Sequence, residues 1–265
     1  MGKKEGIFAG KSGNRVGKKA QVTIFILIAI LIFAVLVVVF YPRIKVFFAP
    51  TEPVSYVEEC IKPEVESIIE KISLQGGSSK PSLYLAYQGN NVEYLCYTNL
   101  YYKTCVMQQP MLKQHIEREV KDYIEAKAKN CINGLKDEME KKGYSVSASY
   151  QSTDVQIIPN NIDVIINAKV SLTKEGTQSF NKFEVRQRSE FYDLVMLAGS
   201  ILNLETRYGT AESTTYMFYY PDIRVEKLVQ GDGSKIYILT NKGTEEKFMF
   251  ATRSLAWPGG YKLSL

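Results

Sequence analysis

The chain has little of what catalysis in proteins most often uses. It holds a single histidine, His115, and a single tryptophan among 265 residues. It contains no dinucleotide-binding or phosphate-loop signature, no His-Glu-x-x-His spacing and no recognisable nucleophile elbow. His115 lies in an amphipathic stretch as Gln114-His115-Ile116, which favours a solvated helix histidine over a catalytic one. The sequence therefore predicts no catalytic residue, no enzymatic activity and no cofactor.

Acidic residues are scarce only at the start of the chain. The formal net charge is +5, with 33 Lys and Arg against 28 Asp and Glu. Six of the basic residues and one acidic residue, Glu5, fall within the first twenty positions, which leaves 27 of each sign in the remainder. A balanced remainder offers no electrostatic footprint for a phosphate backbone, so we exclude nucleic acid as a partner.

One long hydrophobic run interrupts this chemistry. Residues 22–41 contain no charge, glycine or proline. A helix of this length spans about 30 Å, which is the thickness of the hydrocarbon core of a bilayer. The h-region of a signal peptide is shorter, about 7 to 15 residues, and Phe40-Tyr41-Pro42-Arg43 does not resemble a cleavage site. A buried helix of a soluble protein is the alternative.

The flanking charges set the expected orientation. Because Lys and Arg are retained on the inner side, residues 1–21 form a basic cytoplasmic tip or leader, and the part after the span is exported. We therefore expect a single-pass protein of the cell membrane, with the lipid bilayer as its first partner and its C-terminal domain outside the cytoplasm.

The chain has only four cysteines, and all lie after the hydrophobic run, on the expected oxidising side. An even number predicts two disulfides, for which three pairings exist. We expect Cys60 to pair with Cys131, because each lies beside the apolar face of an amphipathic helix, and Cys96 to pair with Cys105 across a short pair of strands. The alternatives are a zinc site, although no Cys-x-x-Cys spacing occurs, and free cysteines in a reducing compartment. No metal ligand is assigned.

The exported part divides into a linker and two regions. Residues 42–53 form the linker, residues 54–143 a helix-hairpin-helix region that carries the four cysteines, and residues 144–265 a β-rich region with one packed helix. The apolar period predicts a helix over residues 54–72, in which Pro63 either introduces a kink or opens a second segment. A long helix is predicted over residues 110–142, and Asn130 and Gly134 permit a break there.

Alternation and turn residues predict the strands. In the first region we expect strands at 82–88, 92–98 and 101–107. In the second we expect strands at 144–151, 155–158, 162–172, 180–188, 214–220, 223–229, 235–240 and 247–253. Ser189 is expected to cap a helix that runs to about Tyr208. The fold class is therefore α+β with antiparallel sheet, and the ectodomain forms one unit or splits near Tyr144.

Two aromatic runs are candidates for a recognition surface. Tyr101-Tyr102 and the run 216–220 could contact a glycan or a partner protein, because tyrosine combines contact area with a polar tip. Strand propensity explains the same residues equally well. The segment 257–261 is similarly ambiguous. Acidic pairs such as Glu58-Glu59, Asp137-Glu138 and Glu245-Glu246 could flank a glycosidic bond, since two carboxylates suffice for its hydrolysis, but they are interpreted as solvated faces. Gly231-Asp232-Gly233-Ser234 is interpreted as a hairpin turn rather than a calcium loop.

At Lys18-Lys19-Ala20-Gln21-Val22-Thr23 the basic tip meets the hydrophobic run in a pattern that resembles the archaeal prepilin-like (class III) signal. The resemblance implies cleavage between Ala20 and Gln21, after which the apolar segment stays on the mature protein. Pilin-type segments commonly carry a glutamate five residues into the mature chain, where this sequence has Phe25.

Three further features resemble uncharacterised single-span surface proteins of small-genome archaea. They are the segments 57–61 and 74–77 and the later amphipathic helix that reaches Cys131. This resemblance covers about half of the chain and implies no activity.

The sequence as a whole predicts a membrane-anchored, non-enzymatic extracytoplasmic module that binds another surface or envelope component, such as a protein, without indicating which one. The alternative is a prepilin-like filament subunit that is cleaved after Ala20 and assembles with like subunits through its transmembrane helix.

Overall fold

The structure is a computed structural model, and it describes residues 28–33, 35, 36 and 53–256. Residues 28–33, 35 and 36 are helical and belong to a unit, Met1–Thr51, that is separate from the compact unit Glu52–Leu265. The rest of the predicted span, together with Ala20 and Gln21, lies outside the described residues. In the part of the chain that the structure describes, no helix is long and apolar enough to cross a membrane.

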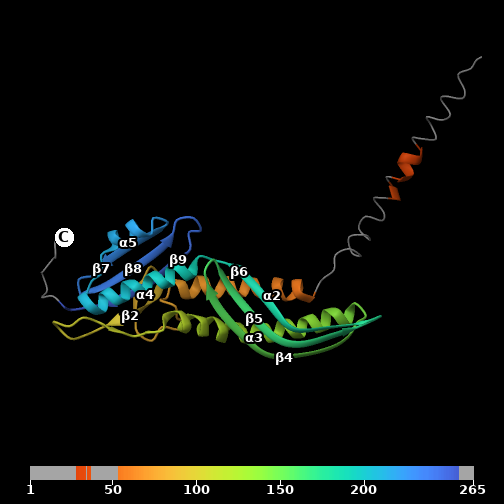
Figure 1. Cartoon of the computed structure of the whole chain (residues 1–265), viewed down its shortest axis with the longest axis horizontal. Coiled ribbons are helices and arrows are strands. Elements are labelled where there is room, and N and C mark those ends of the chain that lie inside the picture. Colours follow the sequence, from red (N-terminus) through yellow and green to blue (C-terminus); the bar gives the residue numbers. More distant parts are fainter. Residues whose placement is uncertain (1–27, 34, 37–52, 257–265) are drawn as a thin grey trace, which may run out of the picture. The chain divides into compact units, whose positions relative to one another are not determined.

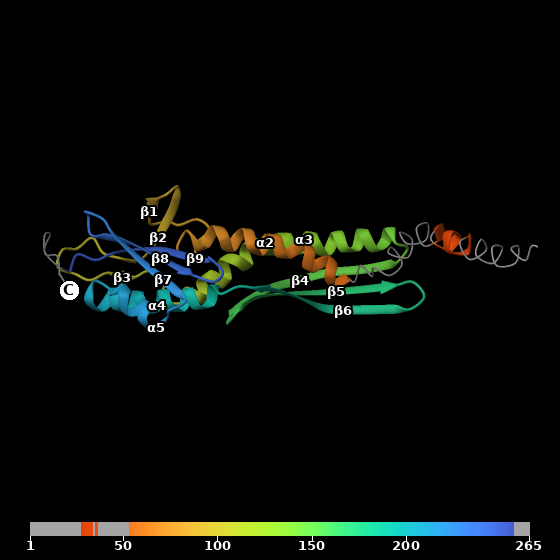
Figure 2. The same cartoon turned by 90° about the horizontal axis from the view of Figure 1, so that it is seen from above.

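One half of the larger unit is a helix pair on a three-stranded sheet (Figures 1 and 2). Helices α2 (Pro53–Ser73) and α3 (Leu112–Lys141) lie side by side, α3 against β4 and α2 against β6. The sheet has the order β4-β5-β6 and is antiparallel throughout. Its strands are β4 (Ser145–Ile158), β5 (Asn161–Thr173) and β6 (Thr177–Arg188).

The other half is a six-stranded sheet on which α4 (Phe191–Tyr208) packs (Figure 1). The strand order is β1-β2-β9-β8-β7, with β3 also paired to β2. The strands are β1 (Tyr84–Tyr87), β2 (Asn90–Tyr97), β3 (Val106–Met107), β7 (Ile223–Val229), β8 (Ser234–Asn241) and β9 (Lys247–Arg253). A second helix of this half, α5 (Ser213–Tyr219), lies against β7. The predicted α+β class with antiparallel sheets is confirmed.

One pairing departs from the antiparallel rule and joins the two predicted regions. Strand β2 comes from the first region and β9 from the second, and they pair in parallel, with Cys96 opposite Thr252. Because this sheet takes strands from both sides of Tyr144, the regions 54–143 and 144–265 do not form separate compact units.

The helix period accounts for α2 and α3. Val57, Ile61, Val65, Ile68 and Ile72 of α2 are buried at spacings of three and four residues, as an amphipathic helix requires. Pro63 lies inside this one helix on its exposed side, where a carbonyl that lacks its donor can bond to water. Helix α3 is likewise continuous, so the break that its sequence permits does not occur.

Three strand predictions were wrong, and one of them, 214–220, falls on the helix α5. The segments 144–151 and 155–158 form one strand, β4, whose register shifts between Tyr150 and Ser152. An added residue of this kind interrupts the alternation in sequence without ending the strand. The predicted strand 101–107 shrinks to β3, because residues 99–103 form an exposed loop.

Two disulfides join the elements, in the pairs that the sequence predicts. Cys60 and Cys131 link α2 to α3 across 71 residues, and Cys96 and Cys105 close a loop of 9 residues beside β2 and β3. Because all four cysteines are bonded, none remains as a thiolate ligand for the zinc site that was the alternative.

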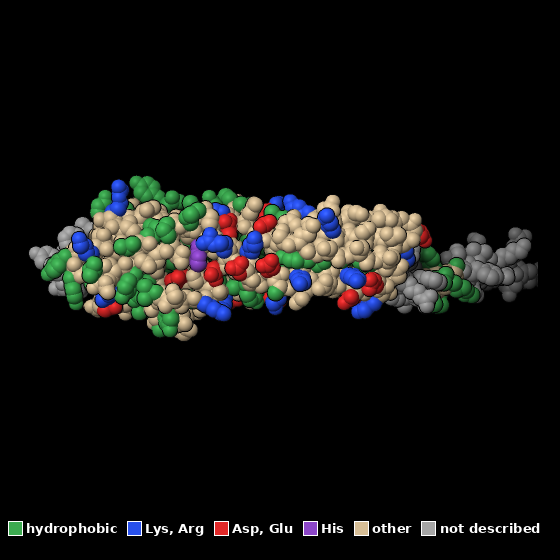
Figure 3. Space-filling view, turned by 90° about the horizontal axis from the view of Figure 1, so that it is seen from below, with side chains coloured by type: hydrophobic (Ala, Val, Ile, Leu, Met, Phe, Trp, Pro, Cys, Tyr) green, Lys and Arg blue, Asp and Glu red, His purple; other side chains and the backbone are tan. Residues whose placement is uncertain are grey.

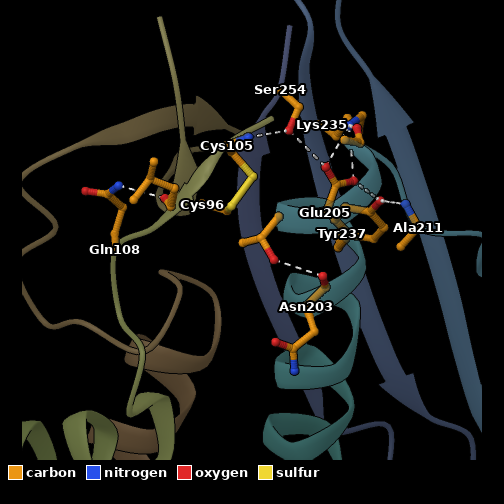
Figure 4. Close-up of a disulfide and its surroundings, with 12 residues drawn as sticks. Cys96, Cys105, Gln108, Asn203, Glu205, Ala211, Lys235, Tyr237 and Ser254 are labelled. Carbon is orange, nitrogen blue, oxygen red and sulfur yellow. Dashed lines mark hydrogen bonds and ion pairs between the residues drawn. A yellow bond between two sulfur atoms is a disulfide. The ribbon is translucent and has the colours of Figure 1, made fainter. Parts of the chain in front are cut away.

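Behind the short disulfide, the inner face of α4 is fixed to the sheet by a buried ion pair (Figure 4). Glu205 is fully buried, and its carboxylate accepts hydrogen bonds from Lys235 at 2.8 and 3.1 Å and from Tyr237 at 2.5 Å. Lys235 also donates to the carbonyl of Gly209. Burial lowers the pKa of the Lys235 ammonium, and the charge of Glu205 opposes that effect.

The disulfides should differ in how much they stabilise the fold. In the chain-entropy model a loop of 71 residues is worth about 4 kcal/mol and a loop of 9 residues about 2.5 kcal/mol. We therefore expect Cys60→Ser/Cys131→Ser to lower the free energy of unfolding more than Cys96→Ser/Cys105→Ser does. Guanidinium unfolding of the full-length variants measures both losses. A larger loss of unfolding free energy on removal of Cys96–Cys105 than of Cys60–Cys131 would contradict this prediction.

The buried ion pair should be costly to break and cheaper to replace. Lys235→Met leaves the Glu205 carboxylate buried without its cation, and we expect a loss of about 3 to 5 kcal/mol. Adding Glu205→Gln removes that charge but keeps an acceptor for Tyr237, so the double variant should be more stable than the single one. Guanidinium unfolding gives both values, and purely additive losses would argue against a coupled pair.

Candidate functional site

The aromatic run 216–220 is helical, which corrects the predicted strand 214–220. Helix α5 begins after Glu212, whose carboxylate accepts the amide of Thr214 at 3.2 Å. Tyr216 points inward, and its hydroxyl lies 3.1 Å from that of Ser200 on α4. Aromatic content matches strand propensity, but here the capping residue and the neighbouring helix decide the local structure.

The residues that follow Tyr216 stay in contact with solvent. The side chains of Phe218, Tyr219 and Tyr220 are 81%, 70% and 51% exposed. Large aromatic side chains that are exposed together commonly mark a binding surface. The three side chains are therefore as accessible as a recognition surface requires. They lie at the end of a helix rather than on a strand.

A groove of about 800 Å³ lies between α4 and these residues, and we call it the α4–α5 groove. Its walls are the first half of α4, the turn after α5 and the turn between β8 and β9. Tyr192, Tyr219 and Tyr220 supply its aromatic surface. Tyr219 and Tyr220 also line a second recess of about 490 Å³, which Leu204 and Glu212 share, so both tyrosines contribute to two hollows.

Hydrogen bonds from backbone amides to side-chain oxygens hold both ends of the groove. At the start of α4, the Glu246 carboxylate accepts the amide of Glu190 at 2.6 Å, and the Ser189 hydroxyl accepts the amide of Phe191 at 3.1 Å. The N-cap residue is Glu190, whose side chain makes no capping hydrogen bond, so the predicted cap at Ser189 is wrong by one residue. On the opposite wall, the side chain of Asn241 accepts the amides of residues 243 and 244 at 2.8 and 3.1 Å. The walls are thus formed before any ligand binds.

The charged residues that line the groove are all acidic, and one cation, Lys242, lies at its edge with its ammonium 2.6 Å from the carbonyl oxygen of Pro221. Glu190, Asp193 and Asp222 line the groove, and no Lys, Arg or His does so among the described residues. Within the described ranges none of these three carboxylates has an ion pair or a side-chain hydrogen bond. Asp193 lies in the first turn of α4, where the helix dipole stabilises a negative charge. The groove therefore combines tyrosine rings with carboxylates that have no cation.

The other aromatic candidate lies elsewhere. Tyr101 and Tyr102 are 78% and 71% exposed on the loop that Cys96 and Cys105 close, and they do not line the groove. Figure 3 shows one face of the molecule. On this face, hydrophobic side chains gather at the end that belongs to the six-stranded half, and Lys, Arg, Asp and Glu lie over the middle. Trp257 and Tyr261 lie outside the described residues.

The acidic pairs do not meet across a cleft. Glu58 forms an ion pair with Lys62 at 2.5 Å, as a solvated helix face would. Glu245 and Glu246 line a recess of about 460 Å³ together with two further carboxylates from α2, Glu66 and Glu70. Arg188 and Lys247 line the same recess, so its charge is mixed. In the turn 231–234, Asp232 accepts the amide of Ser234 at 3.0 Å, which agrees with a hairpin turn.

His115 is not simply solvated, which corrects that prediction. Its Nε2 lies 2.7 Å from the hydroxyl of Ser78, and that hydroxyl lies 2.5 Å from the Glu93 carboxylate. Burial lowers the pKa of His115 and raises the pKa of Glu93. Sequence reasoning missed this cluster, because Ser78, Glu93 and His115 come from three different elements.

The same cluster does not have the arrangement of a serine hydrolase. There the histidine lies between serine and carboxylate, whereas here the serine lies between Glu93 and His115. Ser78 is also only 4% exposed. Gly76 and Gly77 place it there, because their φ angles are +75° and +95° and a Cβ would come within 2.7 Å of Glu93 and Ile116. The glycine pair was the one signal of a close approach in the sequence.

His115 should make stability depend on pH. Because its pKa is lowered in the folded protein, the unfolded chain takes up the proton first as the pH falls, and stability is lost below about 6.5. His115→Gln removes this titration and keeps a donor for Ser78. The advantage of the wild-type protein over the variant should shrink between pH 7.5 and 5 in urea unfolding. The raised pKa of Glu93 has the opposite effect on stability, but it affects the wild-type protein and the variant alike. Parallel curves of unfolding free energy against pH for the two proteins would contradict the prediction.

The whole chain was compared with known protein families, curated proteins and solved structures. Neither the protein-family models nor the curated proteins nor the solved structures contain a match to it. The function is therefore argued from the geometry of the chain itself.

Proposed function

We propose that this chain is a membrane-anchored, non-enzymatic surface module that binds another envelope component in the α4–α5 groove. Residues 22–41 form its transmembrane anchor, residues 1–21 lie in the cytoplasm, and the unit Glu52–Leu265 lies on the far side. The observation that carries the proposal is the preformed groove of about 800 Å³ with tyrosines on its walls.

The recognition role is supported by what the groove displays. Three tyrosines line it, and Tyr219 and Tyr220 keep more than half of their surface exposed. Tyrosine supplies a large contact area at a small cost in conformational entropy and is enriched at the centres of protein interfaces. Helix α5 is held by other residues, because Tyr216 is buried and contacts Ser200 of α4, and Met217 packs against the core.

The anchoring role is supported by the sequence of the other unit and by the two disulfides. Residues 22–41 are uncharged and follow a basic segment, and the cysteines that come after them are all bonded. Disulfides persist in oxidising compartments outside the cytoplasm. Both features agree with a module that is held at the cell surface by its N-terminal helix.

A prepilin-like subunit is the second candidate. The segment 18–23 supports it, because the resemblance implies cleavage between Ala20 and Gln21 and an apolar helix free to assemble with like subunits. Phe25 in place of the usual glutamate counts against assembly. In that case, many copies of the groove would be exposed on the surface of an assembly, rather than one groove on a single anchored molecule.

Anchoring is tested by fractionation of cells that express the full-length chain. We expect the protein to stay in the membrane pellet after alkaline extraction and to be cut by a protease that reaches the outer face. Ile28→Arg/Leu31→Arg should release it, because arginine within a span is costly. Leu100→Arg/Val106→Arg changes two side chains that are 61% and 66% exposed in the other unit and should leave it in the pellet.

Release of the wild-type protein by alkaline extraction would overturn the proposed anchor. The mass of the mature N-terminus separates the two candidates. A chain that begins at Gln21 favours the prepilin-like subunit, particularly if electron microscopy finds filaments. A chain that begins at Met1 or Gly2 favours the anchored module.

A further inference from the structure

We propose that the α4–α5 groove binds a segment of a partner protein that presents lysine or arginine side chains. This inference rests on the proposed function, because it names the ligand chemistry of the same groove. Three observations carry it, namely the charge of the groove, its aromatic walls and the way in which this chain uses tyrosine elsewhere.

The charge of the groove calls for a cation. Glu190, Asp193 and Asp222 lack partners among the described residues, and no basic side chain lines the groove there. The carboxylates belong to two walls, because Glu190 and Asp193 lie at the start of α4 and Asp222 follows α5. A bound segment that covers both walls therefore meets negative charge at two places.

The aromatic walls add a second attraction for the same ligand. The faces of Tyr192, Tyr219 and Tyr220 carry the negative side of the ring quadrupole, which attracts ammonium and guanidinium groups. A volume of about 800 Å³ holds more than one side chain. An extended segment with two cations fits this shape better than a single ammonium compound.

The chain itself pairs tyrosine, carboxylate and cation at two other places. Lys127 lies 3.0 Å from the carboxylate of Glu64 and 6.0 Å from the ring centre of Tyr123. Arg253 lies 3.5 Å from the carboxylate of Asp232, and its guanidinium is 5.7 Å from the ring centre of Tyr97. The groove repeats two parts of this arrangement, tyrosine and carboxylate, and the partner supplies the third.

An oligosaccharide is the competing ligand, because tyrosine and carboxylates also bind sugars. A neutral sugar would cover three carboxylates and remove them from water without supplying a compensating charge, and buried carboxylates are costly unless they are paired. The physical balance therefore favours the cationic segment. Binding of a neutral oligosaccharide is an outcome that the experiment below detects.

The test measures affinity by calorimetry on the full-length protein in a non-ionic detergent. The probes are hexalysine with blocked ends, the same peptide with acetylated side chains, and chitohexaose. We expect hexalysine to bind, with an affinity that falls as salt is added, and the acetylated peptide and the sugar not to bind. Glu190→Gln/Asp193→Asn/Asp222→Asn should weaken binding by at least about tenfold, which corresponds to about 1.4 kcal/mol.

Matched variants keep the result specific to the groove. Glu59→Gln/Asp122→Asn/Asp137→Asn removes three exposed carboxylates on α2 and α3, none of which lines the groove, and should leave the affinity unchanged. Tyr219→Ala should weaken binding, whereas Phe218→Ala should not, because Phe218 is 81% exposed and lies outside the groove. Far-UV circular dichroism checks that each variant is folded.

Three results would overturn the inference. These are no binding of hexalysine, an equal loss in both triple variants, and binding of chitohexaose that depends on Tyr219. The last result would leave the proposed surface module intact, because the groove would still be its recognition site. Failure of the anchor is detected separately by fractionation and does not change the affinities measured here.

Discussion

The ion pair between Glu205 and Lys235 is the interaction on which the recognition half of the molecule depends. It joins the inner face of α4 to the start of β8, at a site where both side chains are buried. A buried pair of this kind stabilises little by itself, but it excludes other registers of the helix because a misplaced carboxylate would be buried without a cation. Our hypothesis is that this pair fixes which residues of α4 face outward, and so determines the groove.

The rest of the fold holds that arrangement in place. The helix pair α2 and α3, joined by Cys60 and Cys131, covers the three-stranded sheet. The sheet ends at β6, and the chain passes directly from there through Ser189 and Glu190 into α4. The start of α4 is therefore positioned by one half of the unit and its inner face by the other. The groove residues at the N-terminal end of α4 are therefore held in place by contacts with both halves of the unit.

Local patterns predicted much of this fold, and long-range contacts account for what they missed. The apolar period predicted α2, and alternation predicted β5, because each pattern depends on which face is buried. The segment 214–220 was predicted as a strand but falls on the helix α5, because Tyr216 contacts Ser200 on another element, α4. The groove could not be predicted, since its walls come from residues near 190, 220 and 242. The exposed tyrosines were named, but the carboxylates beside them were not.

Amide hydrogen exchange tests most directly whether recognition occurs at the outer side of α4. Exchange of the full-length protein would be followed by mass spectrometry with and without a saturating lysine peptide. We predict added protection in the fragments that cover residues 190–200, 219–223 and 241–244, and none in α3. Protection confined to the loop of residues 97–104, or no change anywhere while the peptide binds, would contradict this prediction.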